Sequence, residues 1–250
     1  MRRRRVFQTV AALLAAAAAG SASAVGIEES KQTFPTSTAR VSPLVQRNAI
    51  GSPTKIVWRG NPSERRVALT FDDGPDPRWT PMALDVLEKH GAKATFFMLG
   101  SFVAQHPEIA KTVARAGHEI GSHGWDHQHM NVLAPEELTD SLARTHRQIV
   151  AATGVAPRLM RPPYGQFDAA TAWAIARMDY AIVLWSHRMT ADSPRERAEE
   201  NIATATCGMI MLSHDGRGTP TSEQMQAADW MIGRMQQQGW EFVSVSELLQ

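Results

Sequence analysis

From Arg65 to the end of the chain, short apolar runs alternate with helical patterns, and this alternation restricts the fold more than any other feature. The apolar runs have the length and composition of buried strands: Val67–Phe71, Ala94–Leu99, Glu119–Ser122, Leu159–Arg161, Ala181–Trp185, Met209–Ser213 and Glu241–Val245. The segments between them carry helical patterns: Pro81–His90, Pro107–Ala116, Pro135–Ala152, Ala169–Met178, Arg195–Thr206 and Glu223–Gln238. Strands that alternate with helices predict a parallel sheet covered by helices. We therefore expect an α/β fold, a distorted (β/α) barrel of TIM type with about seven parallel strands.

Two short stretches place reactive side chains at the ends of these runs. In Thr70–Pro75, two adjacent carboxylates, Asp72 and Asp73, follow the first run, and His123–His127 places two imidazoles four residues apart after the third. Barrels of this kind build their sites at the carboxyl ends of the strands. One carboxylate and two imidazoles form a ligand set for a divalent cation, and the second carboxylate is free to act as a base. Together the stretches predict metal-assisted hydrolysis.

These residues also have purely structural interpretations. Asp, Gly and Pro cluster in ordinary turns. A four-residue spacing puts His123 and His127 on one side of a helical turn, as binding of one ion requires, but the same stretch also holds His118 and His129. A single histidine near a strand end, such as His214, is often structural. The individual residues are therefore weak indicators, and their combination carries the hypothesis.

Charge and cysteine content exclude other classes of protein. The chain has 26 Lys+Arg and 25 Asp+Glu, and without the four arginines at positions 2–5 the balance becomes 22 to 25. A nucleic-acid-binding protein would show a basic stripe, which is absent here. Cys207 is the only cysteine, so the chain cannot form an intramolecular disulfide, and its neighbours favour a small buried filler over a nucleophile.

The first 24 residues are typical of an export signal. Arg2–Arg5 form a charged region, Val6–Gly20 a short Ala/Leu-rich core, and Ala22–Ala24 a small-residue cleavage site. The core is shorter than a typical membrane span, although a retained anchor helix is the alternative. Arg4–Phe7 also fits the twin-arginine variant of such signals. We expect a secreted or cell-wall-associated protein with no stable membrane span after processing.

Residues 25–64 are rich in Ser, Thr, Pro and Asn and show no sustained periodicity. Such composition predicts a linker or N-terminal extension. The regular alternation, and with it the main domain, is expected over residues 65–250.

From Arg66 onward the chain resembles the polysaccharide deacetylases with a NodB-type domain, carbohydrate esterase family 4. The resemblance covers about three quarters of the chain and all motif regions of that family, which here are Thr70–Pro75, His123–His127, Arg161–Gly165, Trp185–Ser186 and Leu212–His214. Several motifs in chain order are far more specific than any one of them. The resemblance implies that residues 65–250 form a NodB-type polysaccharide deacetylase domain.

The resemblance also implies roles for the residues around the expected ion. Asp73, His123 and His127 would hold one divalent metal ion, with zinc first and cobalt, nickel or iron as alternatives. Asp72 would be the general base. Arg161 would pair with Asp72 and favour its ionised form.

Other family positions concern the substrate and the leaving group. The backbone N–H of Tyr164 would help to hold the developing oxyanion. His214 would be the general acid that protonates the departing amine. Leu212 would line the pocket for the acetyl methyl group, although a leucine in a buried strand is a core residue by default, and Trp185 would contact substrate.

The chain departs from the family pattern in two places. Gly124 replaces the Ser or Thr that usually follows the first metal-binding histidine. In the fourth motif, Arg188 and Ala191 occupy positions where the family usually has aspartates, and one of those aspartates orients the catalytic histidine. A general-acid histidine needs a partner on its other ring nitrogen. We expect Arg188 to point away and Asp192 to partner His214, because Asp215 would face the opposite side of the strand.

The sequence thus predicts an exported, metal-dependent deacetylase acting on an acetylated polysaccharide or oligosaccharide. N-acetylglucosamine units of chitin, peptidoglycan or an exopolysaccharide are the leading substrate class. The alternatives are an O-acetyl esterase, for example on xylan, and a weakly catalytic carbohydrate-binding member of the same fold.

Overall fold

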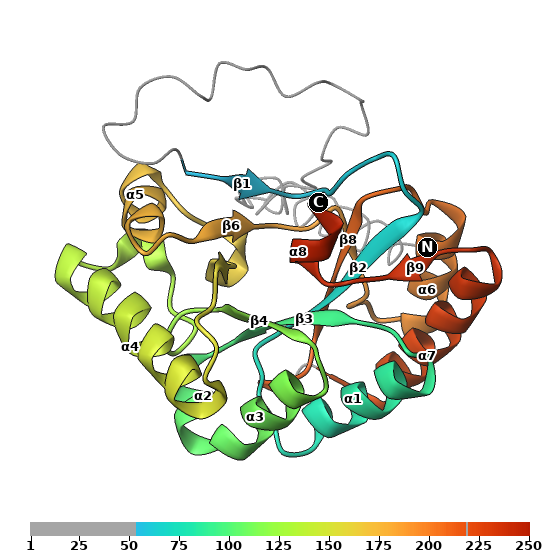
Figure 1. Cartoon of the computed structure of the whole chain (residues 1–250), viewed down its shortest axis with the longest axis horizontal. Coiled ribbons are helices and arrows are strands. Elements are labelled where there is room, and N and C mark those ends of the chain that lie inside the picture. The colour runs from blue at the N-terminus through green and yellow to red at the C-terminus, as the bar shows by residue number, and fades with distance from the viewer. Residues whose placement is uncertain (1–53, 219) are drawn as a thin grey trace, which may run out of the picture. The chain divides into compact units, whose positions relative to one another are not determined.

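One curved sheet of parallel strands organises the computed structural model, which describes residues 54–218 and 220–250 (Figure 1). The strands are β1 Ile56–Val57, β2 Arg66–Asp72, β3 Ala94–Met98, β4 Glu119–Ser122, β5 Leu159–Met160, β6 Ala181–Val183, β7 His187–Arg188, β8 Met209–His214 and β9 Glu241–Phe242. Their order is β1-β6-β5-β4-β3-β2-β8-β7, with β9 paired to the start of β2. Within the described residues, β1 and β7 do not pair with each other, so the sheet curls without closing.

Helices follow most strands and lie around the outside of the sheet (Figure 1). They are α1 Trp79–Lys89, α2 Gly100–Gln105, α3 Pro107–Arg115, α4 Pro135–Thr153, α5 Ala169–Arg177, α6 Pro194–Ala203, α7 Ser222–Gln237 and the short α8 Val245–Leu248. Side-chain oxygens of Asp168 and Thr221 cap α5 and α7 by accepting bonds from backbone N–H groups in the first turn. No helix of the described residues is both long and apolar enough to cross a membrane.

Alternation along the two central strands separates two layers of core. In β2, Leu69 and Phe71 pack into the large apolar cluster under the helices, whereas Ala68 belongs to a second cluster on the inner face. In β8, Met211 packs under the helices and Leu212 on the inner face. Side chains along a strand alternate between the two faces of the sheet. The faces of the last residues, Asp72 in β2 and His214 in β8, are therefore set by which earlier residues of each strand are buried on which side.

The predicted α/β barrel is confirmed, and each of the expected apolar runs contains a strand. Two strands were missed: β7, because its residues His187 and Arg188 form no apolar run, and β1, because the segment around it shows no sustained periodicity. β1 pairs with β6 although it lies in the segment assigned to the linker. The expected strand at Glu241–Val245 is shorter than predicted, since α8 already begins at Val245. The predicted signal peptide lies outside the described residues.

Candidate active site

Asp72 and His214 lie side by side at the carboxyl ends of β2 and β8. The two strands pair in parallel with Asp72 opposite His214 and Thr70 opposite Leu212. By the alternation described above, these four side chains share the inner face of the sheet. The parity of two apolar strands therefore brings a carboxylate and an imidazole together.

Arg161 is completely buried and reaches across the inner face from the end of β5 to β2. Its Nη1 donates to Asp72 Oδ1 and to Thr70 Oγ1, both at 2.7 Å. Its Nε and Nη2 donate to the carbonyl oxygens of Val183 and Leu184. A guanidinium fixed by four acceptors holds the Asp72 carboxylate in a defined position.

A phenyl ring supports this guanidinium from below. The Cζ of Arg161 lies 4.2 Å from the centre of the Phe97 ring. Across from that ring, β4 carries Gly121, where an added Cβ would lie 2.6 Å from Phe97 Cδ1. Only glycine leaves room for the ring at this position, so the small residue in β4 indirectly positions Arg161.

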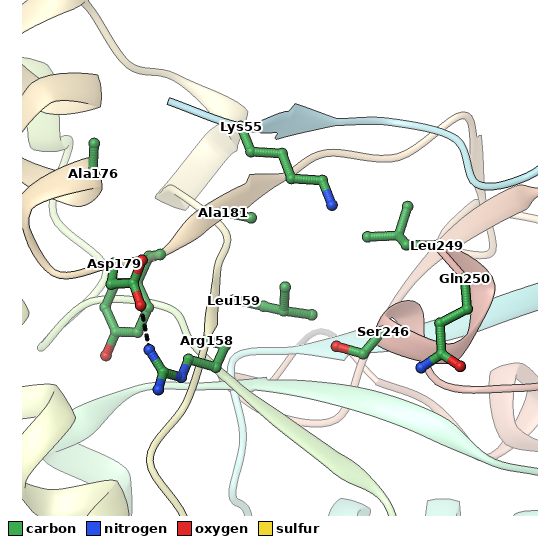
Figure 2. Close-up of a pocket in the computed structure, with 10 residues that line it drawn as sticks. Lys55, Arg158, Leu159, Ala176, Asp179, Ala181, Ser246, Leu249 and Gln250 are labelled. Atoms are coloured by element: carbon green, nitrogen blue, oxygen red, sulfur yellow. Dashed lines mark hydrogen bonds and ion pairs between the residues drawn. The ribbon is translucent and has the colours of Figure 1, made fainter. Parts of the chain in front are cut away.

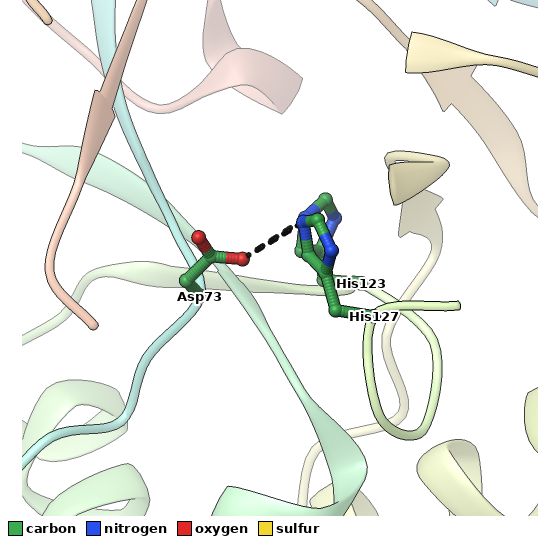
Figure 3. Close-up of side chains that lie close together, drawn as sticks. All are labelled: Asp73, His123 and His127. Carbon is green, nitrogen blue, oxygen red and sulfur yellow. Dashed lines mark ion pairs between the residues drawn. The ribbon is translucent and has the colours of Figure 1, made fainter. Parts of the chain in front are cut away.

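Asp73, His123 and His127 converge on one point (Figure 3). Asp73 Oδ1 lies 3.4 Å from His123 Nε2 and 3.2 Å from His127 Nε2. His123 Nδ1 is 2.7 Å from the carbonyl oxygen of Arg161, which orients the ring and leaves Nε2 facing Asp73. The ligand atoms of the three residues lie within 4.8 Å of one another, close enough to hold one metal ion.

The two histidines are not on a helical turn, so that part of the sequence argument is wrong. His123 follows β4 directly, and the chain then runs as an irregular loop. Asp73 and His127 have positive φ angles of 75° and 64°, and Gly124 has 80°. Left-handed backbone at non-glycine residues is costly and is typical of functional sites.

The backbone of this loop favours glycine at position 124. Its positive φ suits glycine, and an added Cβ would lie 2.7 Å from Met130 Cε. The loop is also bonded to α4, because Ser141 Oγ accepts the backbone N–H of Trp125 at 3.1 Å.

The charges of the three residues suit a cation. Burial opposes ionisation of Asp73. The nearby rings of His123 and His127 outweigh this effect and lower the pKa of Asp73 below its ordinary value. Burial and the charge of His123 lower the pKa of His127 to about 4, so this ring is neutral at neutral pH. Burial alone would lower the pKa of His123, yet the charges of Asp72 and Asp73 raise it. The charges that act on His123 are thus those of the two carboxylates beside it.

The donor set fits a divalent metal ion. Asp73 Oδ1 is buried without a hydrogen-bond partner, as expected of an atom whose partner is an ion. One carboxylate and two imidazoles are ligands that zinc accepts while leaving positions open. The residues predicted as ligands are therefore the ones that the structure brings together.

The predicted substrate residues lie around this centre. Tyr164 has a positive φ of 61°, is 50% exposed, and packs edge-on against His127 at 4.5 Å between ring centres. His129 stacks flat on Tyr164 at 3.9 Å. Leu212 and Trp185 both belong to the inner apolar cluster and are 5% and 8% exposed.

The predicted partner of His214 is wrong. His214 Nδ1 lies 2.8 Å from Thr190 Oγ1, whereas Asp192 is exposed. Thr190 follows β7, which pairs with β8, and this pairing brings the hydroxyl to the ring. Arg188 is exposed, and its guanidinium lies 5.2 Å from the centre of the Trp185 ring, so its predicted orientation away from His214 stays a prediction. No sequence signal distinguished Thr190, because β7 was not expected.

Two further residues at this edge were not predicted to have a role. Asp215 is completely buried, accepts a hydrogen bond from Thr80 Oγ1 at 2.6 Å, and has its pKa raised by burial to about 8. It faces away from His214, as the alternation predicted. Arg217 lies in the loop that follows, with Nη1 3.7 Å from Asp73 Oδ1.

A cavity of about 380 Å³ lies at the opposite ends of the strands (Figure 2). Arg158 and Asp179, which form an ion pair there, precede β5 and β6, and Lys55 precedes β1. None of the predicted site residues lines this cavity. The reactive side chains of the described chain thus gather at the carboxyl ends, where parallel barrels place their sites.

Known proteins share this combination of fold and residues. The family model for polysaccharide deacetylases matches residues 59–183. The peptidoglycan-N-acetylglucosamine deacetylase PgdA of Listeria monocytogenes is 37% identical over 190 residues, which cover 74% of this chain but only 39% of PgdA. The peptidoglycan-N-acetylmuramic acid deacetylase PdaA of Bacillus subtilis is 30% identical over 248 residues, 96% of this chain and 93% of PdaA.

Similarity extends to solved structures. The crystal structure of a CE4 family pseudoenzyme from Bacillus anthracis is 30% identical, with a TM-score of 0.72 over 78% of this chain and 69% of that chain. The chain belongs to the polysaccharide deacetylase family, carbohydrate esterase family 4, as its motifs predicted.

The ligand set can be tested on metal content. Replacing His127 by alanine removes one ligand atom, and zinc affinity should fall by about 100-fold or more, since losing even an outer hydrogen-bond partner of a ligand costs about 10–100-fold. Asp72→Asn should keep the metal, because Arg161 already holds Asp72 Oδ1. Metal analysis of purified protein and titration against a chelator measure both. Unchanged affinity in the His127 variant would refute the ligand set.

The Thr190 contact predicts a selective catalytic defect. Thr190→Val keeps the shape but removes the hydroxyl from His214, and kcat for acetate release from an N-acetylated oligosaccharide should fall about 3- to 10-fold. A chromogenic acetyl ester should be affected less, because its phenolate leaves without needing a proton. Thr190→Ser and Asp192→Ala serve as controls and should behave like wild type. Equal losses on both substrates would argue against His214 as the acid.

Proposed function

We propose that this protein is a metal-dependent deacetylase that removes acetyl groups from N-acetylated amino-sugar units of a carbohydrate polymer. The observation that carries the proposal is the juxtaposition at one sheet edge of a cation site, Asp73–His123–His127, and a separate carboxylate, Asp72, ion-paired with Arg161. Amide hydrolysis needs both an electrophilic centre and a base. The two adjacent aspartates supply one of each.

The chain's own groups divide the chemistry between them. A divalent ion bound at this site, with zinc the best match to the ligands, would supply a Lewis acid that polarises the acetyl carbonyl and activates water. Asp72, held in place by Arg161, takes the proton of the attacking water. The backbone N–H of Tyr164 donates to the oxyanion that develops on the former carbonyl oxygen.

His214 completes the reaction by donating a proton to the departing nitrogen. The Nδ1 atom of His214 is held by Thr190, so Nε2 is the ring nitrogen that can act on substrate. Burial lowers the pKa of His214, while the neighbouring charges of Asp72 and Asp73 oppose that shift. Leu212 and Trp185, on the inner face beside His214, are proposed to contact the acetyl methyl group and the sugar.

Two other functions have specific support. The same site can cleave an ester, so an O-acetyl esterase acting on xylan is the enzymatic alternative. Arg188 and Ala191 in place of the family's usual aspartates, together with the likeness to a CE4 pseudoenzyme, favour a weakly catalytic carbohydrate-binding protein as the second alternative. The Thr190 contact supports turnover, because it supplies His214 with a partner by another route.

Acetate release decides among these functions. Metal-reconstituted protein should release acetate from N-acetylchitooligosaccharide or peptidoglycan fragments faster than from acetylated xylan, and Asp72→Asn should lower kcat about 10²- to 10⁴-fold while retaining metal. Faster turnover of xylan would establish the esterase. Binding of the glycans without acetate release would establish the non-catalytic alternative.

We also propose export with removal of the first 24 residues, supported by the small residues Ala22 and Ala24 before the expected cleavage point. Peptidoglycan, the substrate named for the relatives PgdA and PdaA, lies outside the cytoplasm, which agrees with export. The mature protein should begin near Val25, as mass spectrometry of exported material would show. An intact first segment on membrane-associated protein would instead support an anchor.

A further inference from the structure

Arg217 places a cation beside the metal-binding residues. Its Nη1 lies 3.7 Å from Asp73 Oδ1, the same oxygen that faces the rings of His123 and His127. Arg217 is 36% exposed at its side chain, whereas Arg161, the other guanidinium of the site, is completely buried and engaged by Asp72. Among the described residues, no carboxylate other than Asp73 lies within ion-pair distance of Arg217.

The backbone around Arg217 lies close to Asp73 at Gly216 and is left-handed at residues 217 and 218. Gly216 packs so closely on Asp73 that an added Cβ would lie 2.1 Å from the Asp73 carbonyl oxygen. Arg217 then has a positive φ of 55° and Gly218 one of 70°. Glycine would adopt the conformation of residue 217 without strain, so the arginine there comes at a conformational cost. The close approach of Gly216 ties the loop to the carboxyl end of β2, where the site lies.

Charge balance indicates what Arg217 contacts during function. A divalent ion on Asp73 and two neutral imidazoles leaves one net positive charge, and Arg217 adds another. Asp72 cannot compensate, because its charge is already balanced by Arg161. The mouth of the loaded site therefore attracts an anion, and the exposed guanidinium offers it a forked pair of donors suited to a carboxylate.

We propose that Arg217 binds a carboxylate carried by the substrate, so that the preferred substrate is an acidic acetamido-sugar polymer rather than neutral chitin. A glycan whose sugar units carry a lactyl ether with a free carboxylate has this chemistry. The inference rests on the proposed deacetylase function and specifies its substrate. Arg217 is thereby a specificity-determining residue, separate from the groups that perform the hydrolysis.

A matched pair of ligands isolates the carboxylate. The first is a tetrasaccharide of alternating N-acetylglucosamine and N-acetylmuramic acid with free lactyl carboxylates, and the second is its methyl ester. Wild-type protein should have a lower KM for the free acid. Arg217→Gln should raise KM for the acid about 10- to 100-fold, leave kcat nearly unchanged, and abolish the difference from the ester.

Three controls accompany this variant. Arg217→Lys keeps the charge but not the fork and should retain part of the preference. Arg217→Gly relieves the positive φ and should match Arg217→Gln if only the side chain matters. Arg158→Gln removes an exposed arginine at the opposite end of the sheet and should change neither substrate.

Binding to the inactive Asp72→Asn protein, measured by calorimetry, separates this inference from the proposed function. Tighter binding of the acid than of the ester, lost on adding Arg217→Gln, supports the inference even where acetate release is absent. Equal binding of acid and ester by Asp72→Asn overturns it. Equal losses of kcat/KM on both substrates in Arg217→Gln also overturn it, because Arg217 would then act on a group common to all substrates, such as the oxyanion.

Discussion

The buried ion pair between Arg161 and Asp72 is the interaction on which the site depends. The guanidinium spans the inner face from β5 to β2 and donates to Thr70 in the same strand as Asp72. It also donates to the carbonyl oxygens of Val183, the last residue of β6, and of Leu184. The Arg161 carbonyl also orients His123. Losing one partner of such a pair typically costs about 3–5 kcal/mol, because the other charge is left buried and uncompensated. Arg161 therefore positions the base, orients a metal ligand and packs in the barrel interior.

Loops with strained backbone supply the metal ligands that the strands of the sheet do not. Regular strands deliver Asp72 and His214 to the inner face, but a metal ion needs ligands from several directions, which strands alone do not supply. Asp73 and His127 reach it through left-handed backbone, and Gly124 permits the turn between the histidines. Such conformations persist only where neighbours hold them in place. Here Gly216 presses against the Asp73 carbonyl, and the hydroxyl of Ser141 fastens the histidine loop to α4.

The sequence predicted what depends on period and motif, and missed what depends on distant pairing. The apolar runs were enough to predict the sheet. They also predicted the face on which Asp215 lies, because the alternation of side chains depends only on neighbouring residues of the same strand. Residue chemistry predicted a site of one carboxylate and two imidazoles, and the family resemblance implied that the carboxylate is Asp73. The helical-turn rationale was wrong, because the histidine loop has left-handed backbone and is bonded to Ser141 of α4. The partner of His214 could not be predicted. Thr190 reaches it only because the two-residue strand β7 pairs with β8, and the polar residues of β7, His187 and Arg188, form no apolar run.

The carboxyl groups of Asp72 and Asp215, at the ends of the paired strands β2 and β8, lie in different environments. Both are buried, and the Asp215 N–H donates to the Asp72 carbonyl, yet the side chains lie on opposite faces. Asp72 meets a guanidinium, whereas Asp215 meets the Thr80 hydroxyl, and burial raises the pKa of Asp215 to about 8. An ordinary aspartate in the unfolded chain titrates near 3.9, so between that value and about 8 the folded state holds the extra proton. Asp215 therefore stabilises the fold most at acid pH, and this contribution is lost as the pH rises through 8. Of the two, only Asp72 faces Arg161 and the cation site, and only Asp72 is placed to act as a base.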